Sequence, residues 1–482
     1  MNNVNQVTSN LIWRLAERFG AQAVTMIVSI VLARLLDPVV YGVVAIVTVF
    51  TTILQVFLDG GFSNALIQKK DADDLDFSSV FYFNVFFGLI LYLFLFFTAP
   101  LIASFYKMPE LTAIIRVLGL TVIVFSVKSV QQAYVSRNMM FRKFFFATLG
   151  GTIGAAILGI LMAYLGFGVW SLVAQHLFNM VVDTLILWVM VRWRPKAMFS
   201  WERLKGLLSY GWKLLVSGLI DTIYNDLRQL IIGKMYTSSD LAFYDQGKKY
   251  TQVIVTNINS SIDSVLLPTL SRAQDEVSAV KSMTRRAIKV STYLMMPMMM
   301  GIAVCAEPLV RLLLTDKWLP CVPYMRVFCF TYAFYPIHTA NLNAIKAMGR
   351  SDLFLKLEII KKIIGVVSIA ATIWFGPLVM AYSMLVTTIL NQIVNSWPNR
   401  TLLEYSYRDQ LVDMFPQIAL SCVMGGLVYC IVFLGLSEFA TLCIQVPLGI
   451  GVYVLGSYVF HVDSFTYLLS IIRDFLHRKK KK

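Results

Sequence analysis

Long apolar segments follow one another along the whole chain, separated by short polar stretches. Each segment approaches or exceeds the roughly 18 apolar residues that a helix needs to cross a membrane. Continuous rather than alternating apolar runs favour helices over barrel strands. The pattern predicts an all-α polytopic membrane protein with about fourteen transmembrane helices, at about 10–36, 40–68, 77–105, 110–136, 144–166, 168–192, 209–235, 241–271, 283–314, 320–347, 353–375, 377–400, 415–435 and 439–460.

Two of these segments, the first and the seventh, carry a polar stripe. The first stripe consists of Arg14, Arg18, Gln22, Thr25 and Ser29. The second consists of Lys213, Ser217, Asp221, Tyr224 and Arg228. Both follow the spacing i, i+4, i+8, i+11, i+15, which keeps one helical face. Charge in an apolar helix is costly, so each stripe should face a protein interior or a wet cavity. We therefore expect two walls of one polar chamber.

The stripes belong to an internal repeat. The offset is 199 between Arg14 and Lys213, 204 between Asp59 and Asp263, and 210 between the pairs Arg116-Val117 and Arg326-Val327. An offset that grows only at loops predicts two pseudo-symmetric six-helix lobes, followed by two C-terminal helices. The expected divisions are the N-lobe, an interfacial amphipathic linker, the C-lobe, the last two helices and a basic amphipathic cytoplasmic tail, at 1–192, 193–208, 209–405, 406–460 and 461–482.

The net positive charge and its distribution among the loops predict the orientation of the chain in the membrane. The chain is 58% hydrophobic and only 14% charged, yet its net charge is +15. Soluble domains carry about 25% charged residues. Lys and Arg gather in alternate loops, which is the positive-inside pattern and predicts that both termini are cytoplasmic. The surplus charge therefore indicates topology rather than binding to nucleic acid.

Motifs for chemistry are missing from the sequence. It has no GxxxxGK[ST] phosphate-binding loop, no HExxH motif and no CxxC pair. We therefore expect no enzyme activity, no metal and no cofactor apart from a coupling ion, Na⁺ or H⁺.

Six stretches resemble the polysaccharide transporters of the multidrug/oligosaccharidyl-lipid/polysaccharide flippase superfamily. They are LARLLDPVVYG (32–42), FLDGGFSNALIQKKD (57–71), SRNMMFRKF (136–144), GFGVWSLVAQ (166–175), LRQLIIGKMYTSSDLAFYDQGKKY (227–250) and LLPTLSRAQ (266–274). The resemblance implies a protein of the bacterial inner membrane. It would carry an undecaprenyl-pyrophosphate-linked oligosaccharide from the inner to the outer leaflet by alternating access.

The candidate site residues follow from that ligand. Cationic walls would lower the cost of moving a pyrophosphate and its glycan; the candidates are Arg14, Arg18, Gln22, Lys213, Arg228, Lys248 and Lys249. Asp221, Asp226 and His338 are candidates for ion coupling, although the two acids could instead pair with Arg228 or another neighbouring cation. Asp59 and Asp263, equivalent in the repeat, are expected to be structural, at helix breaks or lobe contacts.

Three other functions remain open. One is a flippase for the peptidoglycan lipid precursor, and a second is a drug–cation antiporter, which would favour a more acidic chamber. A membrane sugar polymerase is a third, but it would need a large outer loop. Expected partners are the lipid-linked oligosaccharide, the bilayer and the polysaccharide polymerase machinery, with the chain as a monomer.

Overall fold

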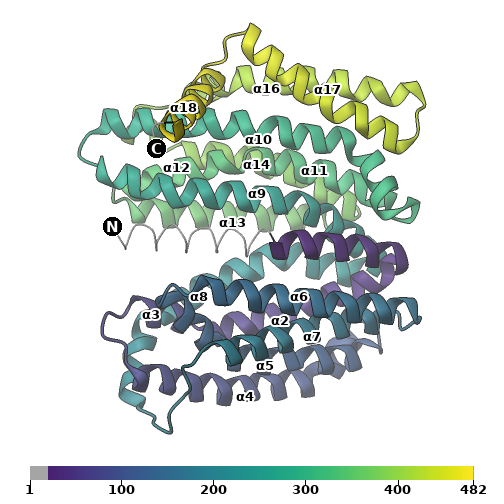
Figure 1. The fold of residues 1–482 in the computed structure, drawn as a ribbon, viewed down its shortest axis with the longest axis vertical. Helices are drawn as coiled ribbons and strands as arrows, with labels where there is room; N and C mark the ends of the chain where they lie inside the picture. Colours follow the sequence, from purple (N-terminus) through teal and green to yellow (C-terminus); the bar gives the residue numbers. More distant parts are fainter. Residues whose placement is uncertain (1–19, 481–482) are drawn as a thin grey trace. The chain divides into compact units, whose positions relative to one another are not determined.

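The computed structural model describes residues 20–480, with side chains at 20–209, 211–470 and 473. All regular structure in this range is helical, as predicted. The chain divides into two compact units, residues 1–242 and 243–482 (Figure 1). The first unit contains a helix visible from Gly20 to Leu35 and then α2 (Pro38–Asp59), α3 (Phe62–Gln68), α4 (Asp74–Tyr106), α5 (Leu111–Arg137), α6 (Phe141–Tyr164), α7 (Val169–Met190) and α8 (Trp201–Met235).

The second unit contains the helices that follow. These are α9 (Ser238–Arg272, whose first residues belong to the first unit), α10 (Val277–Leu314), α11 (Val322–Ala333), α12 (Tyr335–Ala347), α13 (Ser351–Thr372), α14 (Pro377–Ser396), α15 (Asn399–Leu402), α16 (Tyr407–Cys430), α17 (Glu438–Val459) and α18 (Asp463–Lys480), with short 3-10 turns at Asp316–Cys321 and Ile431–Leu434.

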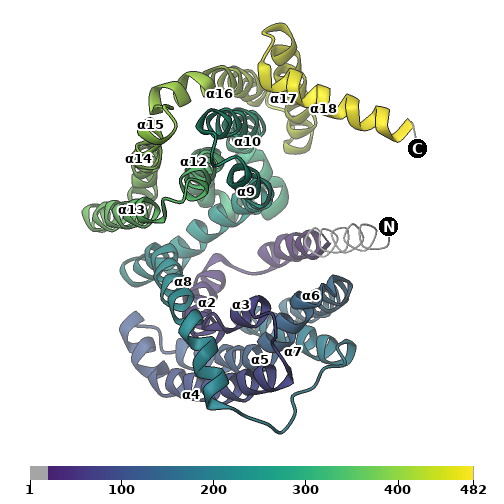
Figure 2. The ribbon, with the colours of Figure 1, turned by 90° about the vertical axis from the view of Figure 1, so that its left-hand side faces the viewer.

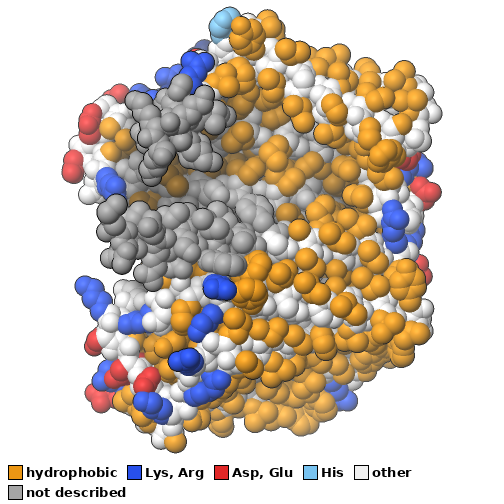
Figure 3. All heavy atoms as spheres, in the orientation of Figure 1, with side chains coloured by type: hydrophobic (Ala, Val, Ile, Leu, Met, Phe, Trp, Pro, Cys, Tyr) orange, Lys and Arg blue, Asp and Glu red, His pale blue; other side chains and the backbone are white. Residues whose placement is uncertain are grey.

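Ten helical stretches within the described range are long and apolar enough to span a membrane. The protein is therefore an all-helical membrane protein. α8 and α13 fall outside these ten, and both carry several charges among their apolar residues. α11 and α12 fall outside because the expected helix 320–347 is interrupted at Phe334. In Figure 3 apolar side chains cover much of the face shown of the first unit, and charged ones gather toward the end with the α7–α8 linker.

The expected helix 40–68 is broken into α2 and α3 by two glycines. Gly60 and Gly61 have φ angles of 48° and 72°, which L-residues with a side chain rarely adopt. The break lies against α8, where a Cβ on Gly61 would stand 2.5 Å from the Gly211 carbonyl oxygen. At the other end of α2, a Cβ on Gly42 would stand 1.8 Å from the Ser238 carbonyl oxygen. Glycine therefore allows α2 and the segment from α8 to the start of α9 to approach closely at both ends (Figure 2).

Packing thus groups α8 with the first unit, whereas the repeat places it in the C-lobe. The two criteria measure different things, since one follows contacts and the other follows sequence equivalence. The division into six-helix lobes stays a prediction.

One contact recurs in the two units at equivalent repeat positions. The Arg116 Nε on α5 donates to the Phe96 carbonyl of α4 at 3.4 Å. The Arg326 Nε on α11 donates to the Ala303 carbonyl of α10 at 3.2 Å. In α4 the reason is visible, because Pro100 lacks the N–H that would otherwise pair with Phe96. Each arginine thus fastens its helix to the preceding one, as a repeat predicts.

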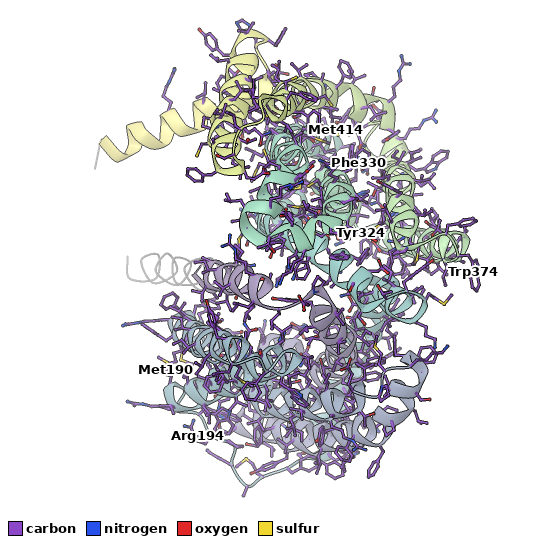
Figure 4. The ribbon with its side chains drawn as sticks, turned by 90° about the vertical axis from the view of Figure 1, so that its right-hand side faces the viewer. Met190, Arg194, Tyr324, Phe330, Trp374 and Met414 are labelled. Atoms are coloured by element: carbon purple, nitrogen blue, oxygen red, sulfur yellow. The ribbon has the colours of Figure 1, made fainter. Side chains whose placement is uncertain are left out.

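The α7–α8 linker differs from the expected amphipathic helix. Residues 191–200 are not helical, and helix resumes only at Trp201. The linker is instead fixed to the start of α4: the Trp193 indole donates to Asp74 at 3.0 Å, and the Lys196 and Ser200 backbone N–H groups donate to Ser78 and Ser79 at 3.0 and 2.9 Å. Residues 193–200 of the expected amphipathic linker are thus not helical, because buried serines of α4 bond their backbone, whereas residues 201–208 form the start of α8. Met190 and Arg194 mark this region in Figure 4.

The last helices of the second unit are fastened to α10 by two tyrosines. Pro297 removes the N–H that would pair with the Tyr293 carbonyl, and the Tyr453 hydroxyl of α17 donates to that carbonyl at 2.9 Å. The Tyr293 hydroxyl in turn bonds Ser457 at 3.0 Å. A proline in a membrane helix is tolerated here because a neighbouring helix satisfies the freed carbonyl.

The glycine crossing of α2 and α8 gives a stability prediction. Gly211→Ala places a Cβ 2.7 Å from the Gly60 carbonyl oxygen. Gly206→Ala, on the same helix, meets no atom within 4 Å. We expect Gly211→Ala to destabilise the protein by about 1–3 kcal/mol, as overpacking does, and Gly206→Ala to be neutral or slightly stabilising. Thermal unfolding in detergent, followed by size-exclusion chromatography, measures both. Equal midpoints for the two variants would contradict the crossing.

Candidate functional site

α8 exposes two different faces side by side. The apolar face consists of Trp212, Val216, Ile220 and Ile223, each between 43% and 50% exposed. Beside it runs an accessible polar face of Lys213, Ser217, Asp221 and Asn225. An apolar exposed face suits lipid, whereas the adjacent polar face needs water or a polar ligand. Most of the predicted stripe of the seventh helix therefore lies on an accessible surface.

α2 and α9 each carry a comparable polar face within their own unit. On α2, the half-buried polar side chains are Thr48, Thr52, Gln55 and Asp59. On α9, the exposed polar side chains are Gln252, Thr256 and Asp263. The offset of 204 that relates Asp59 to Asp263 also relates Thr48 to Gln252 and Thr52 to Thr256. None of these side chains is fully buried. Three helices thus present polar groups that the fold leaves reachable.

The other candidate residues of the polar path differ in how far they are buried. Arg14 and Arg18 lie outside the described residues. In the helix described from Gly20 to Leu35, Gln22 is half-buried and Thr25 is exposed, whereas Ser29 is buried. Half-buried positions also hold the other candidates, namely Asp226, Arg228, Lys248 and Lys249. The described part of the N-terminal stripe thus runs from an accessible end to a buried one.

Each of the two equivalent acids accepts a hydrogen bond from a side chain on another helix. Asp59, at the end of α2, accepts from the Ser63 hydroxyl of α3 at 2.5 Å, across the glycine break. Asp263 on α9 accepts from the Asn343 amide of α12 at 2.9 Å. Both contacts support the structural role predicted for these residues. The role itself stays a prediction.

His338 on α12 is half-buried and meets α14. Its Nδ1 lies 2.8 Å from the Asn395 amide nitrogen. On α13, Lys361 pairs with Glu358 at 2.6 Å, with both side chains largely covered. The second unit therefore brings a histidine, an amide and an ion pair together on three packed helices.

The sequence reasoning missed a buried ion pair in the first unit. Lys128 on α5 lies 2.5 Å from Asp183 on α7, and each residue is 8% exposed. Both stand well inside apolar segments, so the rule that charge in such a segment needs a partner would have found them. They were overlooked because neither belongs to a periodic stripe. α6 packs closely against Asp183, since a Cβ on Gly151 of α6 would stand 2.9 Å from the Asp183 Cβ.

Comparison with known proteins adds the family. The model of a family described as polysaccharide biosynthesis protein matches residues 31–323. The chain belongs to that family. Its relatives include the succinoglycan biosynthesis transport protein ExoT of Rhizobium meliloti, 24% identical over 84% of this chain and 80% of ExoT, and the teichuronic acid biosynthesis protein TuaB of Bacillus subtilis, 24% identical over 76% of each chain.

Solved structures share the fold of this family member. The lipid II flippase MurJ in an inward closed conformation has a TM-score of 0.73 at 14% identity, covering 95% of this chain and 99% of MurJ. An inward-facing multidrug resistance transporter of the MATE family, from the MOP superfamily, has a TM-score of 0.65 at 17% identity, covering 82% and 98%. This chain is a multi-pass membrane protein of a transport family and not an enzyme.

The Lys128–Asp183 pair of this family member gives a second prediction. Lys128→Met leaves a buried carboxylate without its partner, which costs about 3–5 kcal/mol, whereas replacing both partners with apolar residues is close to neutral. We therefore expect Lys128→Met to lower the unfolding temperature strongly and Lys128→Met/Asp183→Leu to recover it. Thermal unfolding in detergent measures the difference.

A matched control comes from the exposed pair Lys196–Asp74, whose side chains are 59% and 43% exposed. Lys196→Met should cost less than about 1 kcal/mol. A double variant at positions 128 and 183 that is no more stable than Lys128→Met alone would contradict the prediction, because removing the unpaired carboxylate would then restore nothing.

Proposed function

We propose that this protein moves an undecaprenyl-pyrophosphate-linked oligosaccharide from the cytoplasmic to the outer leaflet of a bacterial inner membrane. Movement would proceed by alternating access and serve polysaccharide export, with an ion gradient as the driving force. The observation that carries the proposal is the pair of adjacent faces on α8. One face suits lipid and the other suits a polar headgroup.

A lipid-linked sugar needs both surfaces at once. Its polyprenyl tail stays in hydrocarbon, while its pyrophosphate and glycan would lose their water in a bare bilayer. A helix that offers lipid-facing Trp212 and Ile220 next to accessible Lys213 and Asp221 provides a polar route beside the bilayer. The polar faces of α2 and α9 extend the supply of hydroxyl and amide groups that can bond a glycan.

The cations divide by depth along the proposed path. Arg14, Arg18 and Lys213 would receive the pyrophosphate at the cytoplasmic mouth, because arginine binds phosphate through two parallel hydrogen bonds and lysine through a point charge. Arg228, Lys248 and Lys249 would offer later sites toward the outer end, and Gln22 would bond the glycan. Asp221 and Asp226 are the proposed acids for ion coupling on α8.

The proposed topology has fourteen spans and two six-helix lobes. Four further segments, namely the helix at Gly20–Leu35, α8, α13 and the α11–α12 pair, would bring the ten apolar stretches to fourteen. Charge and breaks are tolerated where a helix lines a polar cavity or packs inside protein. Both termini would be cytoplasmic under the positive-inside rule. The basic end of the chain, with α18 in it, would lie on the anionic inner leaflet.

Relatives support a polysaccharide precursor as the cargo, since ExoT is named for succinoglycan and TuaB for teichuronic acid biosynthesis. A peptidoglycan lipid precursor shares the same anchor chemistry and serves as a comparison cargo in the test. Polysaccharide polymerase machinery at the outer face would be the expected partner.

Leaflet transfer tests the proposal directly. In inverted vesicles loaded with radiolabelled lipid-linked oligosaccharide from the source bacterium, we expect Arg14→Ala/Arg18→Ala to lower the transfer rate at least tenfold, and Lys213→Ala severalfold. The expected size follows from the roughly 1.5–3 kcal/mol of a hydrogen bond to a charged group. The rate of appearance of the sugar on the opposite leaflet is the measurement.

Lys196→Gln is the control, because this lysine of the α7–α8 linker already pairs with Asp74 at the start of α4. Its transfer rate should match that of the wild type, and all variants should reach the membrane in equal amounts. Undiminished transfer by the double arginine variant would refute the cationic path. Transfer of the peptidoglycan precursor alone would refute the assigned cargo.

A further inference from the structure

A hydrogen bond joins His338 of α12 to Asn395 of α14. The Asn395 amide nitrogen can only donate, so at 2.8 Å the Nδ1 of His338 must accept. With the amide in this orientation Nδ1 carries no proton, which corresponds to a neutral ring with its proton on Nε2. The T-shaped contact with the Tyr335 ring, at 6.3 Å between centroids, covers another side of the imidazole.

The other half of the same amide is unused. Asn395 is 1% exposed, and its Oδ1 is buried without a hydrogen-bond partner among the described residues. Leaving a buried polar atom unpaired costs about 1–3 kcal/mol. Rotating the amide by half a turn would exchange its two ends and bring Oδ1 to Nδ1. In that orientation the amide accepts a hydrogen bond, which only a protonated imidazole can donate from Nδ1 while keeping the proton on Nε2. One side chain can therefore serve both states of the ring.

Charged and polar groups on the neighbouring helices would respond to a charge on the His338 ring. α13 packs against α12 and carries Lys361, which is paired with Glu358 at 2.6 Å. α14 contributes neutral Gln392, which is 2% exposed with neither amide atom bonded to another described residue. From α9, Asp263 reaches α12 through Asn343, more than one turn beyond the histidine.

We infer that His338 and Asn395 form a proton-binding site of the second unit, in which the Asn395 amide turns over as the imidazole gains or loses its proton. The inference rests on the proposed function in so far as the proton is taken to drive transport. A protonated ring repels the Lys361 ammonium and favours the Glu358 carboxylate, so binding the proton changes the forces between α12 and α13. The Gln392 amide of α14, which has no partner among the described residues, would stabilise the rearranged contact between α12 and α14.

Proton binding is tested without any cargo. The chain has four histidines, so ¹⁵N-histidine NMR of the protein in nanodiscs, assigned with His338→Gln, reports the His338 ring over about pH 5–8. We expect Asn395→Asp to raise the midpoint of its titration by about one unit or more, because an opposite charge at hydrogen-bond distance favours the charged ring. Asn395→Leu should lower it. A ring that stays neutral over this range in both the wild type and Asn395→Asp overturns the inference.

Coupling is tested in proteoliposomes with the radiolabelled lipid-linked oligosaccharide. A pH difference of about one unit supplies at most a tenfold drive per proton. We expect this difference to stimulate transfer by the wild type and by the exposed-histidine control His461→Gln, and not to stimulate transfer by His338→Gln. Stimulation retained by His338→Gln overturns the coupling role.

The two proposals fail in different ways. A wild type that transfers no lipid-linked sugar refutes the proposed function and with it the driving role of the proton. The NMR titration then still decides whether His338 and Asn395 bind a proton.

Discussion

The cost of exposing charge or an unpaired polar group to hydrocarbon governs this structure. Lys128 and Asp183 meet the cost by pairing inside the first unit. The carbonyls of Phe96 and Tyr293, freed by Pro100 and Pro297, meet it by bonding Arg116 and Tyr453. α8 resolves it differently, because its polar face stays accessible beside an apolar one. Polar groups that pair hold helices together, and polar groups that remain accessible are the ones available to a ligand.

Glycine determines which helices can approach closely enough to present those faces. The break at Gly60-Gly61 and its contact with Gly211 join α2 to α8, so that the polar faces of both helices belong to one packed unit. Ordinary side chains at these positions would separate the helices and change the spacing of the polar groups. The α7–α8 linker adds to this arrangement, since its hydrogen bonds to Asp74, Ser78 and Ser79 fix where α8 begins.

The two units use related contacts but differ in their polar interiors. Arg116 and Arg326 occupy equivalent places and each bonds a carbonyl of the preceding helix. The first unit encloses the Lys128–Asp183 ion pair, whereas in the second unit His338 contacts the Asn395 amide, whose oxygen has no partner among the described residues. A fully paired site resists change, while a site with an unused acceptor has a second hydrogen-bonding arrangement available to it.

Sequence alone determined the helical class, the positions of most helices and the polar stripes, because apolar length and helical periodicity are local properties. It also located the equivalent acids Asp59 and Asp263. Tertiary structure decided the contact of the Gly60-Gly61 break with α8, the path of the linker and the pairing of Lys128 with Asp183. Those features depend on contacts between residues far apart in the chain, which no local pattern specifies. The partner of His338 was hidden for the same reason, since Asn395 lies 57 residues further along the chain and meets the ring only because α12 packs against α14.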